Sequence, residues 1–276
     1  MNKLFLCASE EVQSTHKDLL QEIRNEGFNL TPYNQQEYSK NSRVLVLGGD
    51  GSLNYFLNLH KDKETLPQIL YLACGTGNDF SRLFKNREPT LTNFFQLIKG
   101  STIDLPLAEC NGEYFINVAS GGELAKITNP KKEANKERLG KLSYYLEGFK
   151  AGMSLKKSTY KVSIDGSTRK IEAFGYIVAQ GVYAGGGIKV SQSANIHPCL
   201  FDCLFFKAEG VVEMIRSFIE LQKDFSDLDN TLVDFFKCKS LVIEPKGKEI
   251  VKLDGEPYSE SKFYFKHSNK TLPFLV

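Results

Sequence analysis

Two glycine-rich segments of this sequence carry residues whose types and spacing fit chemistry on a phosphate. The first is Gly48–Asn54 (GGDGSLN), directly after the apolar run Val44–Leu47, and the second is Gly75–Arg82 (GTGNDFSR), directly after Ile69–Ala73. Glycines let backbone N–H groups approach a phosphate closely, and the start of a helix favours negative charge. Both segments therefore predict phosphate-binding turns, although a structural strand-to-helix turn explains each of them alone.

The acidic and amide side chains of these segments indicate which phosphate chemistry they could support. Asp50 would repel a phosphate unless a divalent cation or a proton lies between them, which is the arrangement that a nucleotide kinase needs. Asn78 and Asp79 either fix the turn by binding backbone amides or approach a phosphate or ribose. Parallel strands end at one edge of their sheet, where α/β sheets bind ligands. The two turns together therefore predict a nucleotide site.

A third block, Lys252–Pro257 (KLDGEP), adds the carboxylates of Asp254 and Glu256. Asp-Gly between two strands is a common hairpin turn, so the block has a purely structural interpretation. A carboxylate beside an acceptor hydroxyl would instead take up its proton during phosphoryl transfer. Both interpretations stay open from the residues alone.

GGDGS, GTGNDFSR and DGE, in this order and spacing, resemble the three signature blocks of the bacterial diacylglycerol kinase family, whose catalytic domain sphingosine and ceramide kinases share. NAD kinases and phosphofructokinases share a distant GGDG core. Weaker matches at Phe115–Gly121 and Tyr183–Gly187 extend the resemblance over nearly the whole chain. The resemblance implies an N-terminal open parallel α/β nucleotide-binding domain and a C-terminal antiparallel β-sandwich. It also implies ATP, Mg²⁺ and phosphoryl transfer to a lipid hydroxyl such as that of diacylglycerol.

Carried over by position, the resemblance implies a role for each matching residue. Nucleotide binding falls to Gly48, Gly49, Asp50, Gly51, Ser52, Leu53, Asn54, Gly75, Thr76, Gly77, Asn78 and Asp79. Catalysis falls to Asp254, Glu256 and Asp50. Asp50 and Asp104 would take part in a magnesium network through water.

Some positions depart from the family pattern. Cys7–Glu10 stands where the family has an Asn-Pro…Gly phosphate loop, and Tyr55 stands where a Glu is usual. His197–Cys199 replaces an Asp-Asp-Gly loop that holds a structural metal in many bacterial members. Three hypotheses remain: an ATP-dependent lipid kinase, an NAD-kinase-like kinase of a soluble hydroxyl, and a catalytically weak nucleotide- or lipid-binding protein of the same fold. GTGND favours the first.

The elements that must hold these blocks alternate between strand and helix as far as Asp104, which predicts an open parallel sheet. Apolar runs predict buried strands at 4–8, 44–47 and 69–73, and apolar periodicity predicts helices at 9–27, 52–59 and 90–99. Ser9 is the expected N-cap of the first helix and Gly27 its end. The second glycine segment is expected to open a further helix.

After Asp104, strand-like segments dominate, with hairpin signals such as Asn111-Gly112, Asp165-Gly166 and Lys246-Gly247 between them. Strands are expected at 102–109, 114–119, 160–164, 171–179, 201–206, 241–244, 250–253 and 262–265, and helices at 136–153 and 210–225. We therefore expect a nucleotide-binding domain at 1–104, rejoined by 267–276, and a β-sandwich lipid domain at 105–266. The basic flank Lys131–Lys141 is either solvated or meets anionic lipid head groups.

Composition is that of an ordinary globular chain, with 41% apolar and 25% charged residues. A net charge of +2 gives no bulk electrostatic basis for nucleic acid binding. No His/Cys cluster has zinc spacing, no stretch of about 18 apolar residues could span a membrane, and the first residues lack the basic region of a signal peptide. We expect a cytoplasmic enzyme that meets its lipid substrate at the inner membrane face. Oligomeric state, including a homodimer, stays open.

Overall fold

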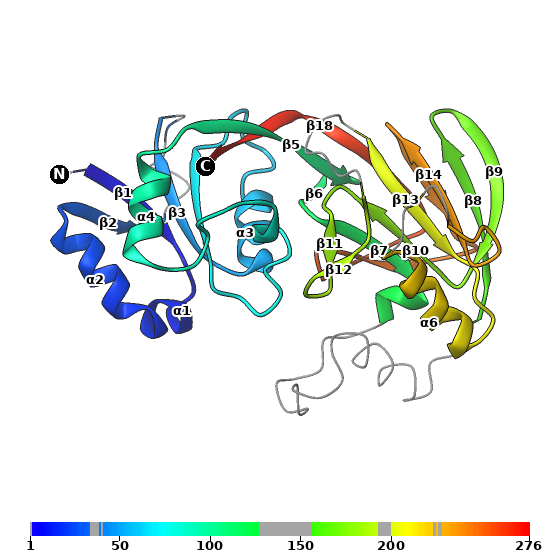
Figure 1. The fold of residues 1–276 in the computed structure, drawn as a ribbon. Coiled ribbons are helices and arrows are strands. Elements are labelled where there is room, and N and C mark those ends of the chain that lie inside the picture. The colour runs from blue at the N-terminus through cyan, green and yellow to red at the C-terminus, as the bar shows by residue number, and fades with distance from the viewer. Residues whose placement is uncertain are drawn as a thin grey trace. The chain divides into compact units, whose positions relative to one another are not determined.

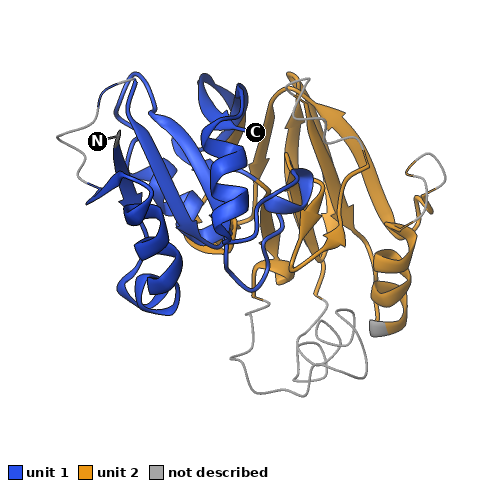
Figure 2. Cartoon of the chain, turned by 60° about the vertical axis from the view of Figure 1, so that its left-hand side comes forward, with its two compact units in different colours: residues 1–116, 267–276 blue, residues 117–266 orange. Residues whose placement is uncertain are grey.

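A computed structural model describes residues 2–33, 39, 41–126, 156–192, 200–222, 225 and 228–276. The chain separates into two compact units, which Figure 2 colours separately. Unit 1 contains residues 1–116 and 267–276, and unit 2 contains residues 117–266. The predicted functional boundary after residue 104 stays a prediction, because compactness groups residues by contact and not by role. Among the described residues, no helix is long and apolar enough to cross a membrane.

Unit 1 is built on parallel strands, as the alternation of strand and helix predicts. The strands are β1 (Asn2–Cys7), β2 (Phe28–Pro32), β3 (Arg43–Gly48) and β4 (Gln68–Ala73), in the spatial order β2-β1-β3-β4. Their apolar runs are buried on both faces, and residues 44–47 are 0% exposed. The last part of β18 (Phe263–Leu275) lies parallel beside β4, with Phe274 opposite Ile69. Figure 1 shows β18 in red, running from unit 2 into this sheet.

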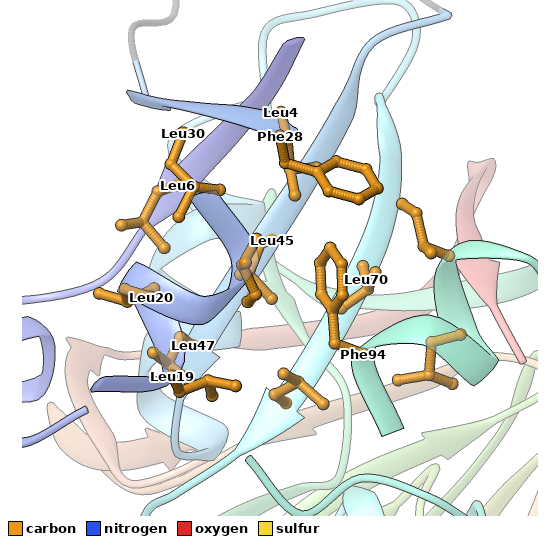
Figure 3. Close-up of a cluster of buried hydrophobic side chains, with 14 of the residues drawn as sticks. Leu4, Leu6, Leu19, Leu20, Phe28, Leu30, Leu45, Leu47, Leu70 and Phe94 are labelled. Atoms are coloured by element: carbon orange, nitrogen blue, oxygen red, sulfur yellow. The ribbon is translucent and has the colours of Figure 1, made fainter. Parts of the chain in front are cut away.

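Helices cover the sheet of unit 1 and complete its core. Ser9 caps α1 (Glu10–Thr15) as predicted, but the expected single helix is interrupted at His16, and α2 (Lys17–Asn25) follows. Thr90 caps α4 (Leu91–Ile98) by accepting a hydrogen bond from the Asn93 backbone. The core cluster in Figure 3 joins leucines of the strands and of α2 to Phe94 of α4, whose ring meets Phe28 edge-on at 5.0 Å.

Unit 1 ends in a hairpin that carries Asp104. The strands β5 (Thr102–Cys110) and β6 (Glu113–Phe115) are joined by Asn111-Gly112, both at positive φ, which confirms the predicted turn. The predicted single strand 114–119 is wrong: it is divided into β6, in unit 1, and β7 (Val118–Gly122), in unit 2. An apolar run alone does not reveal that the chain changes sheets within it.

Unit 2 consists of antiparallel strands in two sheets, which confirms the predicted sandwich. One sheet has the order β14 (Val233–Cys238), β13 (Phe201–Phe206), β10 (Gly175–Ala179), β7, β16 (Glu249–Leu253) and β17 (Glu256–Glu260). The other sheet contributes β9 (Ser167–Ala173), β8 (Ser158–Ile164), β15 (Leu241–Glu244) and the start of β18. Tyr160 of β8 packs edge-on against Tyr176 of β10 at 5.2 Å and Phe205 of β13 at 6.1 Å, so the two sheets share one core.

Two turn predictions for unit 2 have opposite outcomes. Asp165-Gly166 joins β8 to β9 with both residues at positive φ, as predicted. Lys246-Gly247 does not form a hairpin, because β15 pairs with β8 and β18 whereas β16 pairs with β7 and β17. The predicted strand 171–179 is likewise divided between β9 and β10, which belong to different sheets. Each error concerns a point where the chain leaves one layer for the other.

The remaining elements of unit 2 are short. β11 (Tyr183–Ala184) and β12 (Ile188–Lys189) form a hairpin around Gly185–Gly187, and η2 (Glu123–Lys126) follows β7. The predicted helix 210–225 is confirmed as α6 (Val211–Glu220), which packs Met214 and Phe218 into the core of unit 2. The predicted helix 136–153, the basic flank Lys131–Lys141 and the loop His197–Cys199 lie outside the described residues.

Candidate nucleotide and acceptor site

The first glycine segment is the junction between β3 and α3 (Asp50–Asn58). Gly49 is the N-cap in an extended conformation, and Asp50 is the first residue of the helix. The backbone N–H groups of Ser52 and Leu53 already bond to the Gly49 carbonyl at 3.0 and 3.3 Å. An acidic residue in the first turn complements the helix dipole, so the sequence explains where this helix starts.

The second segment follows β4 and differs from its prediction. No α-helix begins at residues 75–82; a single 3₁₀ turn, η1 (Ser81–Leu83), is the only helical structure there. Asn78 adopts φ +50°, and its carbonyl accepts a hydrogen bond from the Ser81 hydroxyl at 2.8 Å. The prediction was wrong because Asn and Asp offer the backbone local turn partners that compete with a helix.

Backbone contact joins the two glycine segments into one surface. A Cβ built on Gly75 would lie 2.5 Å from the Cα of Gly49, a distance that a real side chain essentially never adopts. The Cys74 N–H also donates to the Gly48 carbonyl at 2.9 Å. Glycine is therefore required at Gly75 by a close approach of two backbones, and residues 48–52 and 74–79 must be treated as one site.

The carboxylate of Asp50 holds this surface together. One oxygen accepts a hydrogen bond from the Asp79 N–H at 2.7 Å, and the other accepts one from the Phe80 N–H at 3.1 Å. Asp50 is half-buried at the start of α3. A charged acceptor forms stronger hydrogen bonds than a neutral one, so Asp50 fixes the second segment directly from the first turn of α3.

Two further polar groups mark the surroundings of the joined segments. The Oδ1 atom of Asn78 is buried, and among the described residues it has no hydrogen-bond partner. It lies 3.0 Å from the position that a Cβ on Gly75 would occupy, so it points to where the two segments meet. Burial, and then the negative charge of Asp50, raises the pKa of Tyr71 above its ordinary value. Asp50 therefore brings a negative charge to the joined segments, which a phosphate would meet together with a cation.

Some residues of the predicted nucleotide set face the core. The side chain of Leu53 is 0% exposed and that of Asn54 is 2% exposed. The Asn54 amide donates to the carbonyl of Tyr114 at 3.0 Å instead of pointing at the glycine segments. Their part in nucleotide binding stays a prediction, and it would be limited to holding α3. Ser52 places its hydroxyl over Gly48, where a Cβ on that glycine would clash with it.

The donor groups fit the phosphates of ATP better than a preformed metal cage. The joined glycine segments leave a backbone cradle that side chains would fill. No three His, Cys, Asp or Glu side chains gather in the described residues as a metal site would require. Magnesium is usually held by one or two carboxylates, waters and substrate phosphates, which Asp50 fits. Asp104 is exposed on β5 and accepts a hydrogen bond from the Thr271 hydroxyl at 3.3 Å, and its place in a magnesium network stays a prediction.

The third block is a hairpin turn in unit 2 between β16 and β17. Asp254 and Gly255 have φ +50° and +101°, as an Asp-Gly turn requires. The Asp254 carboxylate also binds the start of β7, because its Oδ1 accepts from the N–H groups of Asn117 and Val118 at 2.9 and 3.0 Å. Glu256 is exposed at the start of β17. Asp254 is thus held rigidly, whereas Glu256 faces solvent.

The residues that sequence reasoning missed are amide and backbone groups. Asn58 bonds to both backbone groups of Tyr114, and the only sequence signal was a second asparagine four residues after Asn54. The N–H groups of Asn117 and Val118, which hold Asp254, carry no side-chain signal at all. Backbone donors become recognisable only when the fold brings them to a carboxylate.

Two family models match the chain, one in each half. Residues 10–110 match the diacylglycerol kinase catalytic domain, and residues 117–274 match the YegS C-terminal NAD kinase beta sandwich-like domain. The diacylglycerol kinase of Bacillus subtilis (strain 168) is 28% identical over 214 residues, which cover 77% of this chain and 70% of that protein. The diacylglycerol kinase of Staphylococcus saprophyticus is 23% identical over 259 residues, covering 90% and 85%.

Solved structures share the fold. A crystal structure from Bacillus anthracis strain Sterne, described as a diacylglycerol kinase, matches with a TM-score of 0.73 at 19% identity, covering 100% of this chain and 96% of that one. An NAD kinase from Archaeoglobus fulgidus in complex with ATP matches with a TM-score of 0.57 at 12% identity, covering 100% and 93%. A YegS C-terminal domain spans more than half of the residues and follows a diacylglycerol kinase catalytic domain, so the chain belongs to the family in which these two domains occur together, that of the bacterial diacylglycerol kinases.

Proposed function

We propose that this protein transfers the γ-phosphate of ATP to the hydroxyl of a membrane lipid such as diacylglycerol, with Mg²⁺ as cofactor. The observation that carries the proposal is the joined pair of glycine segments, in which Gly49 and Gly75 touch through their backbones and Asp50 holds the second segment. The relatives named as diacylglycerol kinases support the lipid acceptor. The A. fulgidus NAD kinase, whose fold is similar, was solved with ATP, which supports the nucleotide.

Each segment has a distinct task in this proposal. The backbone N–H groups of residues 49–51 and 75–77 bind the phosphates, because glycines let the backbone approach a phosphate closely; the Ser52 N–H is already bonded to the Gly49 carbonyl. Asp50 keeps the two segments in register and, through water, orients the cation, whose chemistry is to neutralise charge on the transferred phosphoryl group. Asn78 Oδ1, buried without a partner among the described residues, accepts from a nucleotide hydroxyl or from bound water. The protein thus supplies positioning and electrostatics rather than covalent chemistry.

Asp254 is the better candidate for the group beside the acceptor hydroxyl. It is fixed by two backbone N–H groups, and a fixed carboxylate loses little freedom when a substrate arrives. Glu256 is exposed and would have to become ordered first. We assign Asp254 to receive the hydroxyl proton and Glu256 to a supporting role at the same turn.

A second candidate function is phosphorylation of a soluble hydroxyl, as in an NAD kinase. The A. fulgidus neighbour favours it, since the fold alone is common to both classes. The named relatives and the catalytic-domain match favour the lipid.

We place the enzyme at the inner membrane face, in peripheral contact with its substrate, because a lipid kinase needs only to touch the bilayer.

Gly75→Ala should weaken ATP binding by at least about tenfold while the protein stays folded. The new methyl group would lie 2.5 Å from the Gly49 Cα, so the two segments must separate. Isothermal titration calorimetry with ATP and Mg²⁺ measures the effect. Gly247→Ala is the matched control, because a Cβ there meets nothing within 4 Å. Unchanged ATP affinity in Gly75→Ala would refute the phosphate-binding assignment.

Asp254→Asn should reduce kcat by ~10²–10⁴, the usual contribution of a general base, with ATP affinity retained. Asparagine suits the turn and keeps an oxygen that accepts from Asn117 and Val118, so the variant removes the negative charge and leaves the hairpin. Glu256→Gln should have a smaller effect. Steady-state kinetics and thermal unfolding together check this. If both variants match the wild type, the block is a hairpin turn and no more.

Incubation with γ-labelled ATP should move label into a chloroform-soluble product when lipid is offered in mixed micelles. A panel of lipid extracts, with sphingosine and NAD included, identifies the acceptor class. We expect little transfer to NAD, because the catalytic-domain match is to lipid kinases. Efficient labelling of NAD in the absence of any interface would instead establish the soluble-acceptor function.

A further inference from the structure

Two asparagines on α3, Asn54 and Asn58, form hydrogen bonds to the backbone of a single residue of β6, Tyr114. Asn58 accepts the N–H of Tyr114 at 2.7 Å and donates to its carbonyl at 3.0 Å. Asn54, one helical turn earlier, donates to the same carbonyl at 3.0 Å. The Asn58 amide also donates to the side-chain oxygen of Asn54 at 3.1 Å, so the two side chains act as one fork. All of these contacts lie within unit 1.

This fork replaces a strand partner. β6 has three residues and pairs in the described sheet with β5, with Tyr114 opposite Glu109. The asparagine fork satisfies Tyr114 as a neighbouring strand would. Because Asn54 is 2% exposed, losing these bonds would leave buried polar groups unsatisfied, so the position of β6 follows that of α3.

The chain that leaves β6 leads directly to residues that bond to the Asp254-Gly255 turn between β16 and β17, called the acceptor turn below. Only Phe115 and Ile116 separate Tyr114 from Asn117, whose N–H donates to Asp254 Oδ1 together with that of Val118. The Asp254 N–H donates back to the Val118 carbonyl at 2.9 Å. Asn58 and Asp254 are thus connected by the fork, a short piece of chain and three hydrogen bonds, two of which the Asp254 carboxylate accepts.

We propose that Asn58 is a positioning residue for phosphoryl transfer, acting with Asn54 to hold the chain segment that presents the N–H groups of Asn117 and Val118 to Asp254. This inference rests on the proposed function. In-line transfer tolerates little displacement, and a misplacement of about 1 Å costs ~10²-fold in rate. Asn58 uses its side chain for bonds to Tyr114 and Asn54, so its removal should act on turnover and spare the nucleotide.

Asn58→Ala tests the proposal through a split between binding and rate. We expect kcat to fall about 10²-fold, while the ATP Kd changes by less than about twofold. Asn93→Ala is the matched control: its amide donates to Glu88 at 2.9 and 3.1 Å on α4 of the same unit, away from this path. The control removes a side chain that likewise bonds to a backbone carbonyl, and it should keep wild-type kcat. Equal losses of kcat in the two variants would show a general stability effect and overturn the proposal.

Amide hydrogen exchange tests the same connection without measuring enzyme activity. Amide hydrogen exchange at Asn117 and Val118 should quicken in Asn58→Ala, because the chain that presents these amides to Asp254 is no longer held by the fork. Exchange in β1 and β2, which the fork does not bond to, should not change. Unaltered exchange at residues 117 and 118 would refute the mechanical link. Asn58→Asp, which keeps the acceptor for the Tyr114 N–H, serves if the alanine variant fails to fold, and it should show the same effects in weaker form.

A double-mutant cycle with Asp254→Gly tests whether the two sites act along one path. Glycine tolerates the positive φ of residue 254 and removes the carboxylate. The combined loss of kcat should be clearly smaller than the product of the single losses, since either change already releases the turn. A multiplicative result would overturn the proposal. A wild-type protein that labels no lipid would overturn the proposed function instead, while the exchange experiment would still decide the link from Asn58 to residues 117 and 118.

Discussion

The two backbone hydrogen bonds accepted by Asp50 are the interaction on which the candidate site depends. The second glycine segment has no α-helix behind it, so no helical hydrogen bonds fix its path. Asp50 supplies that restraint from the rigid first turn of α3, with bonds of 2.7 and 3.1 Å to residues 79 and 80. The contact of Gly49 with Gly75 then follows, because the two backbones are drawn together. Asp50, an acidic residue of the first glycine segment, thus holds the site in shape without a ligand.

The same principle recurs at the acceptor turn. Asp254, like Asp50, accepts hydrogen bonds from two consecutive backbone N–H groups, here those of Asn117 and Val118, although it uses one oxygen for both. Asp50 and Asp254 therefore each organise backbone in their own unit. In the proposed reaction, this pre-organisation lowers the cost of placing charged groups at the moment of transfer. The departure at Cys7–Glu10 has a local explanation, because Ser9 caps α1 and the chain enters a helix at the place where the resemblance implies an Asn-Pro…Gly loop. Phosphate binding would rest on the two segments that Asp50 joins.

Much of this architecture could be predicted from the sequence, because the signals were local. Apolar runs such as Val44–Leu47 predicted buried parallel strands, and Asn-Gly or Asp-Gly pairs predicted turns that require positive φ. The errors arose where a distant partner decides the outcome. Lys246-Gly247 resembles a hairpin, yet β15 and β16 find partners in different sheets. The predicted helix after Gly75 gave way to a turn held by Asp50, 29 residues away from Asp79 in sequence. Asn58 and the amides of residues 117 and 118 were missed for the same reason.

The central claim is that the two glycine segments form one ATP-binding surface, and hydrogen exchange measured with and without ATP and Mg²⁺ tests it most directly. The account predicts that amides of residues 48–52 and 75–80 become protected together, at the same ATP concentration. Asp50→Ala should abolish protection in both segments, because it removes the bonds that join them. Protection of one segment alone, or equal protection in the variant, would contradict the account.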